Sequence, residues 1–328
     1  MTESRDRRRT HLLRGLEGGN PLAFMAALGA LRTLTNGWSD QLVRLSWELH
    51  GSQWRPNLHL EAPRTEREVA DALYEMLSSG WDVPGVLLCS RGAADWNNLK
   101  VRPKDFAAIA SGAAEHASPE DRADADFYAA VGSDAIRSRD YMDHTALRLT
   151  SGAGHQDFLP FIRILVKQTE PCQLHSALFD QWRYDDPAPS MRWDPVDDRR
   201  YALRAREPSK DKIRTVRGAN RLAVAALPCF ATAPKASRLA TTGFISGPRR
   251  GNPMEFSWPV WAPPITMKTA ESLLRHSEIV APVPRPTILG PMGVVEVYRA
   301  KVISQDRYKN FTRGSPQLGL RSPRQDHV

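Results

Sequence analysis

The chain has 328 residues, of which 41% are hydrophobic and 25% charged, a balance that indicates a globular protein and excludes wholesale disorder. Its 45 lysines and arginines against 37 carboxylates give a net charge of +8, which favours contact with a polyanion such as nucleic acid. Cys89, Cys172 and Cys229 lie far apart without CxxC spacing and are expected to be buried in a reducing cytosol.

The first predicted element is a helix from Pro21 to about Leu34. Asn20 is a favourable N-cap, and Pro21 occupies the first helical position, where its missing N–H costs nothing. Leucines and alanines surround the whole helix, so it is predicted to be buried. Its apolar run is too short to span a bilayer, and we expect a cytoplasmic protein with no membrane contact.

A hairpin and a second helix are predicted next. Residues 43–49 and 57–61 alternate between apolar and polar side chains, which indicates two antiparallel strands with one wet face. Thr65 and Glu68 have capping-box spacing, and apolar residues then recur with helical period up to Gly80. This pattern predicts a helix with an amphipathic face.

The middle of the chain predicts more helices. Residues 103–131 are typical of two Ala-rich helices, the second capped by Ser118 with Pro119 at its start. Residues 158–166 and 174–182 predict two further apolar helices.

The last third predicts short strands near residues 254–260 and 295–299, with a helix near 269–276. Because helices and strands follow one another irregularly, we expect an α+β fold of mixed helices and antiparallel strands. The expected organisation is an N-terminal α+β region at 1–135, a basic central and C-terminal α+β region at 136–305, and a disordered tail at 306–328.

A cluster of glycines precedes the first predicted helix, and the N-terminus of a helix attracts phosphate. A phosphate could be held by Arg14, Gly18, Gly19 and Asn20. The cluster lacks the Lys-Ser/Thr pair of a P-loop and the GxGxxG spacing, so a tight turn into the helix is the alternative.

Two other patterns resemble catalytic motifs. The carboxylates Asp185, Asp186, Asp194, Asp197 and Asp198 suggest a metal-dependent nuclease, but neighbouring arginines favour structural ion pairs instead. Residues 151–155 resemble a nucleophile elbow, yet Leu149 occupies the position of its first glycine. We therefore expect no resident metal or cofactor and no catalytic activity.

The strongest physical signal is the basic stretch between Arg199 and Arg221, which ends in a predicted Ala-rich helix at 220–227. Its cations favour phosphate backbones through counterion release, and Tyr201 could stack on a base. A solvated or protein-facing surface is the alternative interpretation. The residues predicted to contact nucleic acid are Arg199, Arg200, Arg204, Lys210, Lys212, Arg214, Arg217 and Arg221.

Several blocks of the chain resemble a known family. Residues 11–31, which include the run Asn-Pro-Leu-Ala-Phe and then Ala-Ala-Leu-Gly-Ala-Leu, resemble the start of CRISPR-associated proteins from type I-G (formerly I-U) loci. Residues 193–203 and 218–223 are similar to further blocks of that group, and residues 145–152 are a weaker likeness. The resemblance extends over about two thirds of the chain.

The resemblance implies a large-subunit-like component of an RNA-guided DNA-targeting complex, in which such subunits contact target DNA while others hold the guide. The expected partners are DNA and/or guide RNA and other CRISPR effector subunits. The chain is short for a full-length large subunit, so a reduced role is expected. The expected function is therefore a non-catalytic, nucleic-acid-binding subunit of a type I CRISPR interference complex, with a protein-only scaffold subunit or a metal-dependent nuclease as alternatives.

Overall fold

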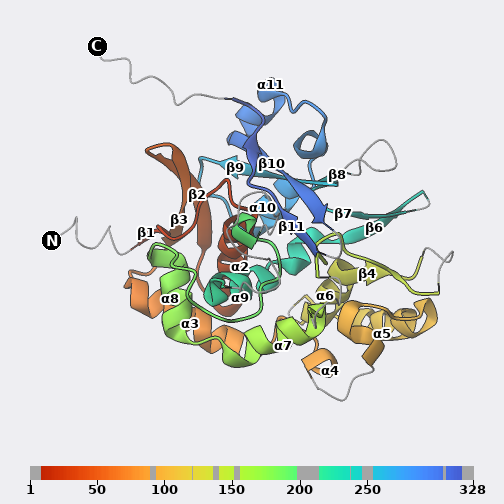
Figure 1. Ribbon diagram of the computed structural model, residues 1–328. Coiled ribbons are helices and arrows are strands. Elements are labelled where there is room, and N and C mark those ends of the chain that lie inside the picture. The colour runs from red at the N-terminus through yellow and green to blue at the C-terminus, as the bar shows by residue number, and fades with distance from the viewer. Residues whose placement is uncertain are drawn as a thin grey trace, which may run out of the picture.

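The computed structural model describes residues 9–88, 94–119, 121–135, 140–150, 156–197, 214–236, 238–245, 254–305 and 308–319. They form an α+β fold in which helices and antiparallel strands alternate irregularly, as predicted (Figure 1).

The α-helices are α2 (Pro21–Gly37), α3 (Glu66–Ser78), α4 (Gly85–Leu88), α5 (Pro103–Glu115), α6 (Ala123–Val131), α7 (Phe158–Gln168), α8 (Pro171–Phe179), α9 (Arg217–Ala225), α10 (Met267–Leu274) and α11 (Pro286–Leu289). The 3-10 helices are η1 (Ala94–Asn98), η3 (Pro195–Asp197), η6 (Leu227–Phe230), η7 (Ser277–Val280) and η8 (Gly290–Met292). The strands are β1 (Thr10–Leu12), β2 (Val43–His50), β3 (Gln53–Leu60), β4 (Gly132–Ser133), β5 (Asp143–His144), β6 (Thr232–Lys235), β7 (Arg238–Thr241), β8 (Phe244–Ile245), β9 (Glu255–Trp261), β10 (Val294–Gln305), β11 (Tyr308–Phe311) and β12 (Ser315–Pro316).

Two sheets and two ribbons contain these strands. One sheet has the order β1-β3-β2, with the predicted hairpin β2–β3 in the register Leu45↔Leu58. The other has the order β11-β10-β9-β8, with β12 paired to β10. The ribbons are β4–β5 and β6–β7, and every strand pair in the described ranges is antiparallel.

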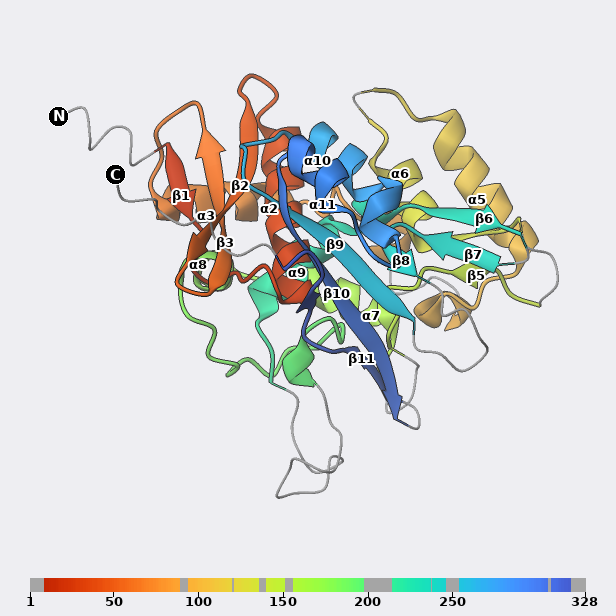
Figure 2. The same ribbon diagram turned by 90° about the horizontal axis from the view of Figure 1, so that it is seen from above.

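Helix α2 lies at the centre of the molecule, between strands and other helices (Figure 1, Figure 2). It is buried from Pro21 to Leu34, and the Asn20 side chain accepts hydrogen bonds from two backbone N–H groups of its first turn, as predicted. The Phe24 ring stacks on Trp47 of β2 at 6.0 Å between centroids and lies 5.8 Å from Trp258 of β9. This helix therefore joins the two sheets in one core.

Helix α9 packs directly across α2. A Cβ atom placed on Gly29 of α2 would lie 1.8 Å from the carbonyl oxygen of Leu222, which is closer than any real contact. The two backbones approach this closely only because the position is glycine. The resulting core runs from Leu13 to Phe311 and draws on both of the regions that the sequence suggests.

Several helix boundaries differ from the predictions, among them α9, which spans Arg217–Ala225 where 220–227 was predicted. Ser118 caps only a turn, because its hydroxyl accepts from the N–H of Asp121, and α6 begins at Ala123. Helix α8 ends at Phe179 instead of Trp182, since Asp180 at its C-cap is extended. The predicted capping box of α3 is confirmed, with both Thr65–Glu68 hydrogen bonds present.

Part of the stretch 306–328 is ordered, contrary to the expectation of a disordered tail. Strands β11 and β12 lie within it, and Phe311 is fully buried. The buried carboxylate of Glu296 accepts the backbone N–H groups of Gln317 and Leu318, at 3.0 and 2.8 Å. A distant side chain supplies these bonds, so local composition does not reveal them. Within the described ranges, no helix combines the length and the apolar character needed to cross a bilayer.

Candidate nucleic-acid interface

The cation surplus of the chain is unevenly distributed. The described residues contain 28 of the 45 lysines and arginines and 29 of the 37 carboxylates, so their net charge is −1. The whole surplus of eight positive charges is therefore carried by the remaining segments of the sequence. Of the predicted nucleic-acid contacts, five lie outside the described residues, as does Tyr201: Arg199, Arg200, Arg204, Lys210 and Lys212.

Arg221 is not a surface cation, and its prediction as a phosphate contact is wrong. Only 1% of this residue is exposed. Its guanidinium donates two hydrogen bonds to Asp82, at 2.7 and 2.6 Å, and a third to the carbonyl of Leu77 at 2.9 Å. A buried guanidinium whose charge is matched by a carboxylate is not accessible to a phosphate from outside. The pair instead ties α9 to the segment after α3.

Arg217 also faces the protein's own carboxylate, so its predicted role is wrong for the same reason. Its Nε and a terminal nitrogen each donate to Asp186 at 2.9 Å, and the two side chains are 15% and 14% exposed. A further bond reaches the carbonyl of Gln168. Asp186 thus belongs to an ion pair, which is the alternative that the sequence favoured over a metal site.

Arg214 keeps its predicted exposure. Its guanidinium donates to the carbonyl of Asp185, and within the described chain no carboxylate pairs with it. Of the three described cations of the basic stretch, this one is available to an external anion.

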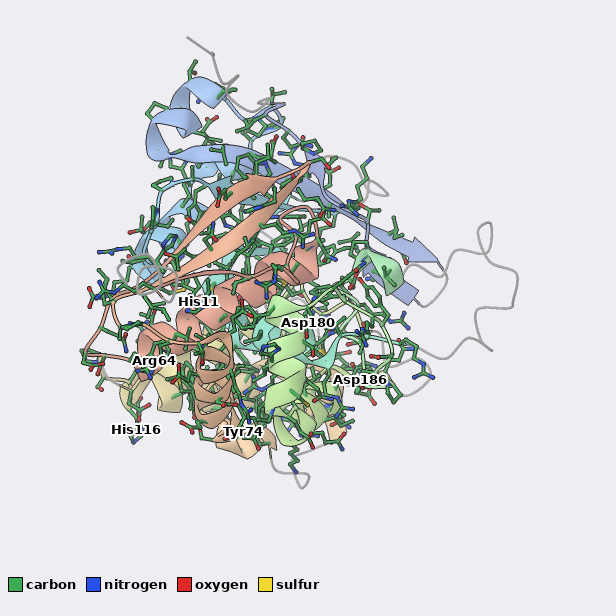
Figure 3. All side chains as sticks on the ribbon, turned by 90° about the vertical axis from the view of Figure 1, so that its left-hand side faces the viewer. His11, Arg64, Tyr74, His116, Asp180 and Asp186 are labelled. Atoms are coloured by element: carbon green, nitrogen blue, oxygen red, sulfur yellow. The ribbon has the colours of Figure 1, made fainter. Side chains whose placement is uncertain are left out.

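Two clefts open side by side around the segment after α8. The first, the α2 cleft, has a volume of about 700 Å³ and lies beside the N-terminus of α2. The second, the α8 cleft, has a volume of about 510 Å³ and lies between α8 and the start of α9. Asp180, Gln181, Trp182 and Tyr184 line both of them. Asp180, at the end of α8, and Asp186 lie on the same face of the molecule in Figure 3.

An aromatic pair forms the wall between the clefts. The half-buried indole of Trp182 is anchored by a 2.9 Å hydrogen bond from its Nε1 to the carbonyl of Ala177. Tyr184 packs against it edge to face, with 6.1 Å between ring centroids. Tyr184 has φ +53, and Arg192 further along has φ +68, although neither is glycine. Such backbone strain is concentrated at functional sites.

Arg183 completes this surface. It lies between the two aromatic residues in sequence, is exposed, lines the α8 cleft, and has no ion-pair partner among the described residues. We call Trp182, Arg183, Tyr184 and Arg214 the Trp182 surface. The sequence held a signal for it, since Trp-Arg-Tyr directly precedes the Asp-Asp-Pro turn, but the predicted helix over 174–182 concealed that signal.

Two backbone donors of the glycine-rich turn before α2 are already bonded within the protein. The N–H of Gly18 donates to the carbonyl of Trp54 at 2.8 Å, and the N–H of Asn20 donates to that of Glu17 at 3.0 Å. The Asn20 amide caps α2 and also donates to the buried carboxylate of Asp194 at 3.3 Å. The predicted phosphate contact at Gly18 and Asn20 is therefore wrong, and the tight turn is confirmed.

The other two predicted phosphate contacts at this turn are also engaged. Gly19 is buried, and its carbonyl accepts from the N–H of Gly314 at 2.8 Å. Arg14 makes a bidentate pair with Glu66, at 2.9 Å for both bonds, and this hydrogen bonding raises the pKa of Arg14. The charge of Arg14 is thus already matched by a carboxylate.

The predicted nuclease alternative depends on carboxylates that could hold a metal ion. No group of three or more His, Cys, Asp or Glu side chains in the described residues is arranged to hold a metal ion. Asp194 is 2% exposed and accepts from the Tyr184 hydroxyl at 3.2 Å. Asp198, the side chain of Asp197 and residues 151–155 lie outside the described residues.

The cysteines differ from one another. Cys229 is buried as predicted, and burial raises the pKa of its thiol to about 12. Cys172 is exposed at the α8 cleft, contrary to the prediction, because it lies on the outer face of the first turn of α8. Cys89 lies outside the described residues.

Comparison with known proteins gives no assignment: no protein-family model matches the chain, and no curated protein matches it.

Proposed function

We propose that this chain is a non-catalytic, nucleic-acid-binding subunit of a type I CRISPR interference complex. The link to that complex rests on the sequence blocks at residues 11–31, 193–203 and 218–223. The capacity for nucleic acid is supported by the net charge of +8 and by the Trp182 surface. Its partners are target DNA and/or guide RNA together with the other effector subunits, and it acts in the cytoplasm.

The observation that carries the proposal is a half-buried indole near two exposed arginines that have no carboxylate partner among the described residues. Trp182 lines two clefts, Arg183 follows it in sequence, and Arg214 contacts the carbonyl of Asp185; neither arginine has a carboxylate partner in the described part of the chain. Single-stranded nucleic acid is bound in this way, by base stacking on aromatic rings and by phosphate contacts from cations. Two other arginines line these clefts, and each forms an ion pair within the protein: Arg14 with Glu66 and Arg217 with Asp186.

The decisive experiment measures binding of the full-length chain to a fluorescent single strand and to a duplex over a series of salt concentrations. Changing Arg183→Ala and Arg214→Ala together removes two phosphate contacts. The slope of log K against log salt should then fall by about 1.4 for the single strand and about 1.8 for the duplex. Trp182→Ala should cost about 1–3 kcal/mol of single-strand binding and leave the duplex nearly unaffected.

A matched control removes the same charge elsewhere. Lys235→Ala with Arg238→Ala changes two exposed cations on the β6–β7 ribbon, which lies on the opposite side of the molecule from α8 in Figure 1. This variant should keep the wild-type slope. An equal loss of slope in both double variants would refute the Trp182 surface as the contact, and a wild-type chain that binds neither probe at low salt would favour the protein-only scaffold.

A further inference from the structure

A second cationic site lies away from the Trp182 surface, around Arg148. This side chain is largely buried, and that burial lowers its pKa; among the described residues no carboxylate forms an ion pair with it. Its two terminal nitrogens contact the carbonyl of Thr150 at 3.2 Å and the His144 ring at 2.6 Å. A desolvated guanidinium without an anion is costly, so its presence calls for an explanation.

Two buried polar atoms at this site have no hydrogen-bond partner among the residues that the structure describes: the Nε of Arg148 and the Oγ1 of Thr150. Thr150 is only 1% exposed, so solvent does not satisfy its hydroxyl. Buried donors in folded proteins are nearly always paired, and an unpaired one indicates a missing ion, water or ligand. Both atoms are able to donate to an oxyanion, and the bond from Arg148 to the Thr150 carbonyl brings the two residues into contact.

The neighbouring histidine is arranged as a neutral ring. The Nδ1 of His144 donates to the carbonyl of Thr145 at 3.1 Å, which leaves its Nε2 to accept from Arg148. The pKa of His144 is lowered to about 4, chiefly by burial and then by the charges of Arg148 and Lys309, while the hydrogen bond to Thr145 and the charge of Asp143 oppose the shift. The charge that Lys309 on β11 exerts on this ring comes from an exposed side chain.

Segments distant in the sequence build the site. His144 of β5 pairs with Gly132 of β4, and the N–H of Ala146 donates to the Thr241 hydroxyl of β7 at 3.0 Å. Figure 2 shows β5 alongside β7. Strands β4, β5 and β7 thus position the segment that carries His144.

We propose that Arg148, Thr150 and Lys309, with His144 behind them, form a binding site for a phosphate group. Phosphate is favoured because it supplies a negative charge for two cations and several acceptor oxygens for two unpaired donors. The group could belong to a nucleic-acid backbone or to free phosphate. This site is independent of the Trp182 surface, so either assignment can fail without the other.

The test uses thermal unfolding of the full-length chain in sodium phosphate and in sodium chloride at equal ionic strength. Phosphate should raise the Tm of the wild type above its value in chloride, because a ligand that binds only the native state stabilises it. Thr150→Val keeps the shape of the side chain and removes a hydroxyl that has no internal partner. Its Tm in chloride should equal or exceed that of the wild type, while its phosphate affinity falls about tenfold.

Arg148→Met separates a ligand site from a structural role. If the guanidinium awaits a phosphate, this variant keeps its Tm in chloride and loses the phosphate-dependent shift. A large loss of Tm in chloride with an unchanged phosphate shift would overturn the proposal, and so would a wild type that phosphate stabilises no more than chloride. An NMR titration of the His144 ring adds a direct readout, since a bound phosphate should raise its pKa.

A short oligonucleotide distinguishes the two sources of the group. If it shifts the His144 resonances and competes with inorganic phosphate, the ligand is a backbone phosphodiester. If inorganic phosphate alone shifts them, the ligand is free phosphate. Both outcomes support the site, and an absence of response to either probe refutes it.

Discussion

At the scale of the residue, a run of arginines in sequence does not define a charged surface. Arg214, Arg217 and Arg221 follow one another within eight positions, yet the first is exposed, the second is paired with Asp186, and the third is buried against Asp82. The last two lie four positions apart on the same face of α9, so they differ in position along the helix: Arg217 in the first turn reaches Asp186, and Arg221 one turn further on reaches the buried Asp82. The buried pairs were not predictable, because their carboxylates come from distant segments.

The buried pair of Arg221 and Asp82 gives a first stability prediction. Arg221→Ala leaves the Asp82 carboxylate uncompensated in the core, so it should lower the free energy of unfolding by about 3–5 kcal/mol. Urea unfolding followed by circular dichroism measures this loss. The control is Arg214→Ala, an exposed position, where the change should stay within about 0.5 kcal/mol. Similar results for both variants would contradict the buried pair.

At the scale of the element, local patterns predict structure where the helix or strand supplies its own signals. Asn20 and Pro21 fix the start of α2, and the capping box fixes the start of α3. The end of α8 and strands β11 and β12 depend on tertiary partners instead, including the Glu296 carboxylate, and the sequence patterns missed them. The Trp182 surface was missed for the same reason, since its placement follows from where α8 ends.

The space around two helical glycines predicts whether alanine at each position raises or lowers the stability of the protein. Replacing a glycine in a helix interior by alanine normally raises the free energy of unfolding by up to about 1 kcal/mol. In Gly29→Ala the new Cβ would overlap the Leu222 carbonyl, and overpacking of about 1–3 kcal/mol or more outweighs that gain. Gly112→Ala in α5 meets nothing within 4 Å and should stabilise. The Tm should therefore fall in Gly29→Ala and rise in Gly112→Ala. Two Tm shifts of the same sign would refute the close packing.

At the scale of the whole molecule, one core crosses the boundary that the sequence suggested near residue 135. Helix α2 packs on α9, and its Phe24 contacts Trp258 of β9, so each region completes the core of the other. The division into regions 1–135 and 136–305 therefore stays a prediction that is based on sequence patterns. The α+β class itself was predictable, because it needs only the kinds of element and their irregular order.

This shared core predicts how the chain unfolds. The isolated fragment 1–135 exposes the apolar surface of α2 that α9 and β9 cover, so it should show no cooperative thermal transition. The full-length chain should unfold in one transition, with near-UV circular dichroism and tryptophan fluorescence coinciding. A sharp transition in the fragment would instead establish an autonomous N-terminal domain.

The burial of α2 also bears on ancestry. The proposed link to CRISPR-associated proteins rests in part on this helix and the turn before it, and from Pro21 to Leu34 the helix is buried. Neighbours on every side restrict which substitutions it tolerates, so it should drift slowly in any descendant of the fold, whatever that descendant binds. Lineages that exchange one ligand for another should vary first at Arg183, Arg214 and Lys309, and should keep the helix almost unchanged.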